Sequence, residues 1–92
     1  MNPEVVDNPS EHRFELPAGD ALAVAYYAAE DGRILLLHTE VPQALSGQGI
    51  GSRLAKGVFE TLRQRRARVV AKCPFMASYA ARHPEYAALL DG

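Results

Sequence analysis

A glycine-rich turn between an apolar segment and an amphipathic segment constrains this chain more than any other feature. The apolar segment, Ile34–Leu37, predicts a strand covered on both faces. Pro42 cannot donate a ladder hydrogen bond, so regular pairing should stop near Val41. The turn and the apolar face behind it consist of Gly47, Gly49, Gly51, Ile50, Leu54, Val58, Leu62, Ala55 and Phe59. Their spacing predicts a helix over Gly49–Arg66 that begins inside the glycine run.

The beginning of this helix is expected to bind an anion. Glycine has no Cβ, so backbone N–H groups there can approach a ligand closely. A helix N-terminus also carries about half a positive charge, which favours phosphate. The turn is not a P-loop, because Ser52-Arg53 rather than Lys-Ser/Thr follows Gly51. It also lacks the G-x-G-x-x-G spacing of a dinucleotide fingerprint, and the chain is short for a doubly wound sheet.

The flanking segments predict a mostly antiparallel twisted sheet with one parallel pair around the helix, an α/β (α+β) fold. Asp31-Gly32 is a hairpin signal between two strands. The expected strands are Val5–Asp7, His12–Leu16, Ala21–Ala28, Ile34–Leu37 and Val69–Ala71. In the third, Leu22, Val24 and Tyr26 share one face and alanines the other. Pro84 should divide two short C-terminal helices, 75–82 and 85–90. They are expected to cover a sheet face with Phe75, Met76, Tyr79, Tyr86 and Leu89.

Size and composition restrict the function classes. The 92 residues predict one domain over 1–92, and the net charge of −1 argues against nucleic acid as a partner. Arg63, Arg65, Arg66 and Arg68 are interpreted as cations that match the helix dipole. The single cysteine excludes an internal disulfide, and no segment is typical of a signal peptide or membrane span. We therefore expect a cytoplasmic protein, with no metal site because His and Cys lack ligand spacing.

Three motifs together resemble one enzyme family. The first is V-P-x(4)-G-x-G-I-G-x-x-L over Val41–Leu54, the second is Cys73-Pro74-Phe75, and the third is His83-Pro84-Glu85-Tyr86. With His38–Pro42 they resemble the small stand-alone GNAT-like N-acetyltransferases, whose loop motif is Q/R-x-x-G-x-G/A. Ser46 stands where that motif has Gln or Arg. The resemblance implies a trimmed GNAT fold that transfers an acetyl group from acetyl-CoA to an amine.

The resemblance also implies a binding site for CoA. The loop N–H groups would hold the pyrophosphate, and the backbone of Glu40 and Val41 would pair with the pantetheine amides. Arg53 and Lys56 would reach the 3′-phosphate, although each by itself is more readily interpreted as a surface charge. The implied CoA-binding residues are Glu40, Val41, Ser46, Gly47, Gln48, Gly49, Ile50, Gly51, Ser52, Arg53 and Lys56.

His38 and Glu40 are the candidates for the catalytic base. Period-two alternation places them on one face of the Ile34 strand. Histidine is a natural proton acceptor at neutral pH, and Glu40 could act through a water. The alternative is that His38 is a core histidine and Glu40 a surface carboxylate. In this family, positioning of the amine against the thioester often suffices for catalysis.

Cys73 and Tyr79 are candidates for the remaining chemistry. Cys73 follows the second parallel strand. It is either a nucleophile that forms an acetyl-cysteine, an acid for the leaving thiolate, or a small buried apolar residue. Tyr79 matches the region where many GNAT enzymes keep a tyrosine acid, and it also suits a core.

The expected partners are acetyl-CoA and an amine, with the protein a monomer or weak dimer. A protein lysine, an N-terminal α-amine and a small metabolite remain open as acceptors. The alternative function is a non-catalytic module that binds CoA, acyl-CoA or a partner protein.

Overall fold

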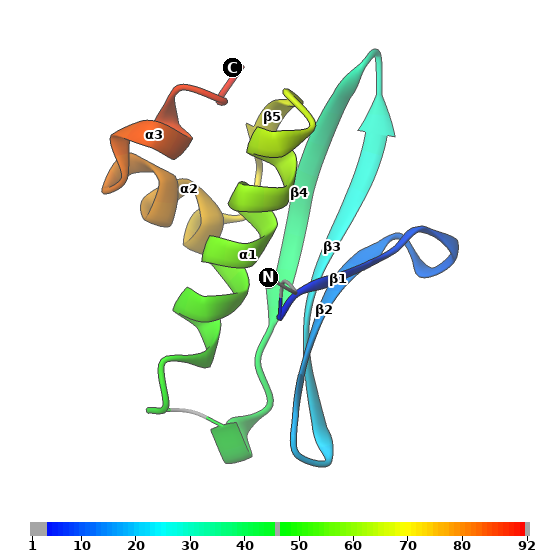
Figure 1. Ribbon diagram of the computed structural model, residues 1–92, viewed down its shortest axis with the longest axis vertical. Helices are drawn as coiled ribbons and strands as arrows, with labels where there is room; N and C mark the ends of the chain where they lie inside the picture. Colours follow the sequence, from blue (N-terminus) through cyan, green and yellow to red (C-terminus); the bar gives the residue numbers. More distant parts are fainter. Residues whose placement is uncertain (1–3, 46, 92) are drawn as a thin grey trace.

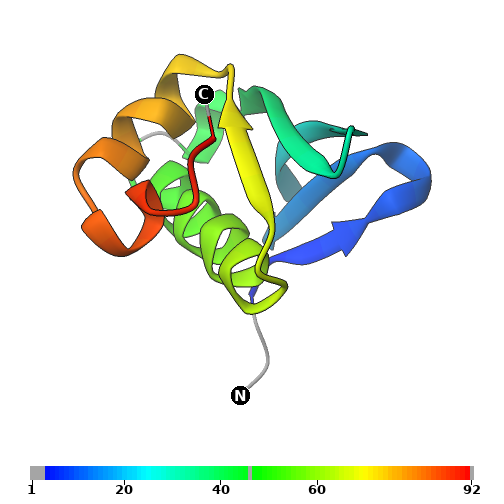
Figure 2. The ribbon, with the colours of Figure 1, turned by 90° about the horizontal axis from the view of Figure 1, so that it is seen from above.

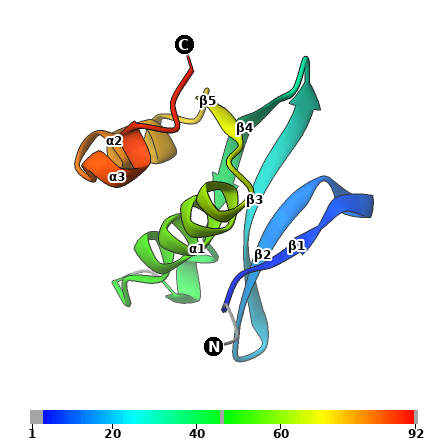
Figure 3. The ribbon, with the colours of Figure 1, turned by 45° about the horizontal axis from the view of Figure 1, so that its top comes forward.

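The three α-helices of the described residues lie on one side of a single five-stranded sheet. A computed structural model describes residues 4–45 and 47–91. The strands follow one another in the order β1-β2-β3-β4-β5. Figure 1 shows the sheet on one side and the helices on the other, and the turned views in Figures 2 and 3 show the same two layers.

The sheet has the predicted topology. The first four strands pair antiparallel with their neighbours, and β5 pairs parallel to β4. Their bounds are Val6–Asn8 for β1, Arg13–Ala18 for β2, Ala21–Glu30 for β3, Arg33–Glu40 for β4 and Arg68–Ala71 for β5. Asp31 and Gly32, between β3 and β4, have φ of 54° and 76°. A two-residue hairpin of type I′ requires two such left-handed residues, so the Asp-Gly signal is confirmed.

The helices differ from the prediction at the C-terminal end. α1 spans Ile50–Gln64 and α2 spans Pro74–Ala81, close to the expected ranges. α3 is only Pro84–Ala87, so the predicted helix to Leu90 is wrong. Leu90 instead forms a parallel bridge with Val69. The outer edge of β5 would otherwise have unpaired backbone groups, and this return of the chain satisfies them.

The core lies between α1 and the alanine face of β3. The expected apolar face of α1 is buried, from Ile50 to Leu62. On β3 the residues in the core are Ala23, Ala25 and Tyr27, rather than the row that contains Leu22. Small side chains allow the helix to approach the sheet closely. Phe14 and Leu16 of β2 and Leu36 of β4 complete this layer.

The other face of the sheet has no helix over it among the described residues. Leu37 is 43% exposed, so the expectation of a strand covered on both faces is wrong at its end. Phe75 is 38% exposed and does not cover the sheet as expected. Among residues 4–45 and 47–91, no helix is long and apolar enough to span a membrane.

We predict that Gly57→Ala destabilises the protein. Alanine normally stabilises a helix interior by about 1 kcal/mol relative to glycine. Here a Cβ at Gly57 would overlap the side chain of Val5, which is buried against α1. Overpacking typically costs roughly 1–3 kcal/mol, so the melting temperature should fall. Ser52→Ala, at an exposed position of α1, is the control for helix propensity alone. A higher melting temperature for Gly57→Ala would contradict the packing described here.

We also predict that stability falls as the pH rises from about 10 to about 12. Burial raises the pKa of Tyr27 to about 12, and its hydroxyl donates a 2.6 Å hydrogen bond to Asp7, which adds to the shift. The unfolded chain loses this proton near pH 10, so within that window unfolding releases a proton and becomes easier. Urea unfolding at pH 8 and pH 11 would measure the change. Tyr27→Phe should weaken the pH dependence, and an equal slope in both proteins would contradict the assignment.

Candidate functional site

Strand β4 separates from the edge strand β5 halfway along its length. Their pairing ends at Leu36 and Ala71, whereas β4 continues to pair with β3 as far as Glu40. At the point of separation the carbonyl oxygen of Leu36 accepts hydrogen bonds from the N–H groups of Lys72 and Cys73, both at 2.9 Å. The β5 side of residues 37–40 therefore has no strand partner among the described residues.

A β-bulge at the same point sets which side chains face which way. Tyr27 pairs with Leu36 and Tyr26 pairs with His38, so Leu37 is an extra residue in β4. Thr39 then pairs with Ala25, on the core face of β3. A bulge re-aims the side chains that follow it. It turns Thr39 towards the helices and His38 towards the helix-free face.

His38 and Glu40 contact each other on the helix-free face. His38 Nε2 lies 3.1 Å from Glu40 Oε2, as expected for two residues on one face of a strand. Their side chains are 62% and 57% exposed, so the alternative of a core histidine is wrong. The rings of Tyr26 and His38 are nearly parallel, at 11° and 6.3 Å between centroids. The imidazole is thus oriented by a carboxylate on one side and an aromatic ring on the other.

A neighbouring ion pair continues this row across the sheet. Arg13 lies opposite Tyr26, with its guanidinium carbon 5.9 Å from the ring centroid. Arg13 Nε donates a 2.7 Å hydrogen bond to Glu15, and this contact lowers the pKa of the Glu15 carboxyl. Glu15 therefore stays an anion balanced by Arg13, which leaves Glu40 as the carboxylate in contact with the imidazole.

The glycine turn leads into α1 as predicted. Gly47 and Gly49 have φ of 81° and 71°, in the left-handed region that favours glycine. Apart from the chain neighbours, no described residue has an atom within 4 Å of the position of a Cβ at either glycine, so there is open space around both positions. The first N–H groups of a helix have no intrahelical acceptor and point out of its N-terminus. Gln48, Ile50 and Ser52 are in the same segment, and Ser46 lies outside the described residues.

The ends of three elements meet at Gly51. A Cβ there would lie 3.1 Å from Cζ of Phe75 and 3.7 Å from a methyl carbon of Val41. Val41 follows β4, Gly51 is in the first turn of α1 and Phe75 is in the first turn of α2. Because Gly51 has no Cβ, the end of β4 and the first turns of α1 and α2 can lie close together there. Sequence reasoning missed Phe75 as a site residue, although its place after Cys73-Pro74 could have indicated it.

Cys73 and Tyr79 are both buried, but they contact different groups. Cys73 is 5% exposed, and its Sγ is 3.3 Å from Thr39 Oγ1. Tyr79 stacks on His83 at 4.2 Å and on Phe59 at 6.1 Å between centroids. Burial raises the pKa of Tyr79, so its hydroxyl is protonated at neutral pH. The structure places Tyr79 in the aromatic cluster between the helices rather than among the exposed groups of β4.

Arg53 and Lys56 are on the exposed side of α1. Arg53 forms an ion pair with Glu4, and this hydrogen bond is the main reason that the pKa of Glu4 is lowered. A phosphate bound by Arg53 would have to compete with that carboxylate. Lys56 is exposed.

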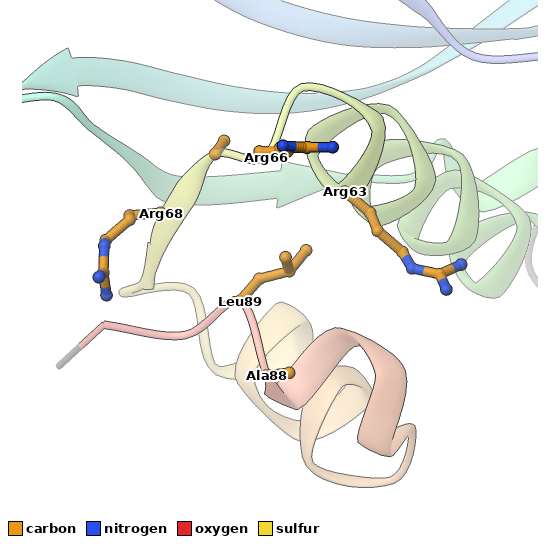
Figure 4. Close-up of a pocket in the computed structure, with 6 residues that line it drawn as sticks. Arg63, Arg66, Arg68, Ala88 and Leu89 are labelled. Carbon is orange, nitrogen blue, oxygen red and sulfur yellow. The ribbon is translucent and has the colours of Figure 1, made fainter.

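A hollow of about 360 Å³ lies at the opposite end of α1 from the glycine turn. Arg63, Arg66, Ala67, Arg68, Ala88 and Leu89 line it. Arg63 and Arg68 point away from each other (Figure 4). The Nη1 atom of Arg63 lies 3.6 Å from Oε2 of Glu60. A helix C-terminus also disfavours an anion. These arginines do not gather around one ligand. Within residues 4–45 and 47–91, no group of three His, Cys, Asp or Glu side chains could hold a metal ion.

Two comparisons relate this chain to known proteins. A family model described as GCN5-related N-acetyl-transferase matches residues 13–89. The solution NMR structure of a GCN5-like protein from Staphylococcus aureus, proposed to be an N-acetyltransferase, superposes with a TM-score of 0.71. The two sequences are 29% identical, over 99% of this chain and 90% of the other. The matched region contains the sheet from β2 to β5, the glycine turn and α2, and the chain belongs to the GCN5-related N-acetyltransferase family.

Proposed function

We propose that this protein transfers the acetyl group of acetyl-CoA to an amine, with one domain over residues 1–92 carrying the whole activity. The observation that carries the proposal is the separation of β4 from β5 directly beside the glycine-rich start of α1. It supplies unpaired backbone groups on a strand and N–H groups at a helix N-terminus in one place. Acetyl-CoA needs both, because it has amides along its pantetheine arm and phosphates at its other end.

The residues present fit CoA. The open space around Gly47 and Gly49 lets backbone N–H groups reach a pyrophosphate. The backbone of Glu40 and Val41 would pair with the pantetheine amides, where the β5 side of β4 has no strand partner among the described residues. Arg53 and Lys56 would contact the 3′-phosphate in place of Glu4. The loop residues proposed to bind are Ser46, Gly47, Gln48, Gly49, Ile50, Gly51 and Ser52.

The amine is proposed to attack the thioester directly from the helix-free face. A backbone N–H near Val41 would polarise the thioester carbonyl, in the manner of an oxyanion hole. His38, oriented by Glu40 and Tyr26, would accept a proton from the amine. The leaving CoA thiolate would take a proton from Cys73 or Tyr79, which are the candidate acids.

The exposure of His38 and Glu40 favours one competing function. Among the described residues no helix covers their face of the sheet, so no enclosed acceptor groove is built there. A module that binds CoA without transferring the acetyl group would have the same cofactor site. Thermal-shift titration with CoA tests the proposed ligand, and acetyl transfer to a panel of amines, peptides and polyamines separates enzyme from module. No shift of the folded protein at millimolar CoA would refute both.

We predict that Gly49→Ala weakens CoA binding at least tenfold and that Gly32→Ala leaves it unchanged. Both glycines have a positive φ and open space around a Cβ, so both variants should lose a similar stability, about 1 kcal/mol. Gly32 lies in the β3–β4 hairpin, at the end of the molecule opposite the glycine turn (Figure 1). Calorimetric titration with CoA would compare them. Equal affinities of the two variants for CoA would mean that the glycine turn does not bind CoA.

We predict that His38→Gln and Glu40→Gln lower kcat while KM for acetyl-CoA stays unchanged. General-base catalysis typically contributes about 10²–10⁴-fold, and neither side chain is expected to contact CoA. Glu30→Gln, at the exposed end of β3, is the matched control for loss of a carboxylate. Steady-state kinetics with an acceptor identified by the panel would measure both constants. An unchanged kcat in both variants would mean that positioning alone drives the transfer.

A further inference from the structure

Lys72 is one of two lysines in the chain, and its backbone lies where β4 and β5 separate. Its N–H donates a 2.9 Å hydrogen bond to the carbonyl oxygen of Leu36, the last residue of β4 that pairs with β5. On the β5 side, the pairing ends at Ala71, directly before Lys72. The backbone of this lysine is therefore fixed at the opening that is proposed to receive the thioester.

The residues before and after Lys72 indicate which face its side chain occupies. Ala71 packs against the core between the sheet and the helices, and Cys73 is part of that core. Cys73 has an extended backbone, with φ of −77° and ψ of 121°. Successive side chains of an extended chain point to opposite faces, and Lys72 is exposed. Lys72 therefore lies on the helix-free face, which is the face of His38 and Glu40.

The surroundings of Lys72 suit an amine that reacts at the opening. Among residues 4–45 and 47–91, no ion pair includes Lys72, so no carboxylate holds its ammonium group elsewhere. His38 and Glu40, on the same face, are the groups proposed to accept a proton from an amine. The flexible four-carbon stem of a lysine allows its amine to turn towards the opening.

We propose that Lys72 is an internal acetyl acceptor, whose ε-amine takes the acetyl group of acetyl-CoA bound to the same molecule. The inference rests on the proposed function, since acetyl-CoA must lie along the β5 side of residues 37–40. The ammonium group first loses one proton to solvent through His38. The neutral nitrogen then attacks the carbonyl carbon of the thioester, and a C–N bond forms as the C–S bond breaks. A second proton passes from the nitrogen to the CoA thiolate, which leaves as the thiol.

Peptide mapping by mass spectrometry after incubation with acetyl-CoA tests this site. A protease that cleaves after arginine places Lys72 in peptide 69–82 and Lys56 in peptide 54–63, so the two lysines are measured separately. Lys56 is the internal control, because it is also exposed but belongs to α1, on the other side of the sheet. Lys72→Arg keeps the positive charge and removes the amine. Hydroxylamine cleaves a thioester but not an amide, so it distinguishes acetylated Lys72 from acetylated Cys73.

We expect the acetylation of Lys72 to be at least about tenfold faster than that of Lys56, because positioning raises the effective concentration of the amine. The rate per molecule should not depend on protein concentration, since the transfer occurs within one molecule. Lys72→Arg should remove the hydroxylamine-resistant label from peptide 69–82. Equal rates at the two lysines, an undiminished rate at Lys72 in urea-unfolded protein, or a rate that rises with protein concentration would each overturn the proposal.

The two proposals fail in different experiments. Thermal-shift titration of the wild-type protein with CoA reports on the proposed cofactor site without reference to Lys72. If the protein binds CoA and acetylates an amine of the panel while Lys72 stays unmodified, the internal acceptor is wrong and the proposed function stands. If the folded protein binds no CoA and Lys72 is acetylated no faster than Lys56, both proposals are wrong.

Discussion

The carbonyl oxygen of Leu36 accepts two hydrogen bonds from consecutive residues, and the candidate site depends on this contact. The second of these donors is Cys73, which is the N-cap residue of α2. The hydrogen bond that ends the pairing of β4 and β5 therefore also positions the start of α2. Beyond it, β4 pairs only with β3 among the described residues, and it runs beside the start of α1. A strand edge that lacks a partner presents N–H and C=O groups with which another extended segment can pair.

The bulge at Leu37 then divides the chemistry between two faces. On the helix side, Thr39 meets the buried sulfur of Cys73. On the other side, His38 and Glu40 contact each other in solvent. His38 and Glu40 are therefore exposed, whereas the thiol of Cys73 is buried. The sheet separates the two sets.

Close packing between α1 and one face of the sheet explains how a chain of this length keeps α1 and β4 in place. Ala23 and Ala25 on β3 and Gly57 on α1 are small, so α1 lies close to the sheet and Val5 fits against it. Close packing makes the relative position of α1 and β4 rigid. That rigidity places Gly51 against Val41 and Phe75, and it brings the helix N-terminus to the strand ends.

The sequence by itself determined the elements and the glycine turn, because their signals are local. The four-residue repeat of α1, Asp31-Gly32 and the open turn around Gly49 each depend on a few neighbours along the chain. Only the tertiary structure decided which faces the side chains occupy. The bulge arises from the register of β4 against β3, so alternation within β4 could not reveal Thr39 beside Cys73 or Leu37 in solvent. The pairing of Leu90 with Val69 likewise depends on contacts far apart in the sequence, which no local pattern encodes.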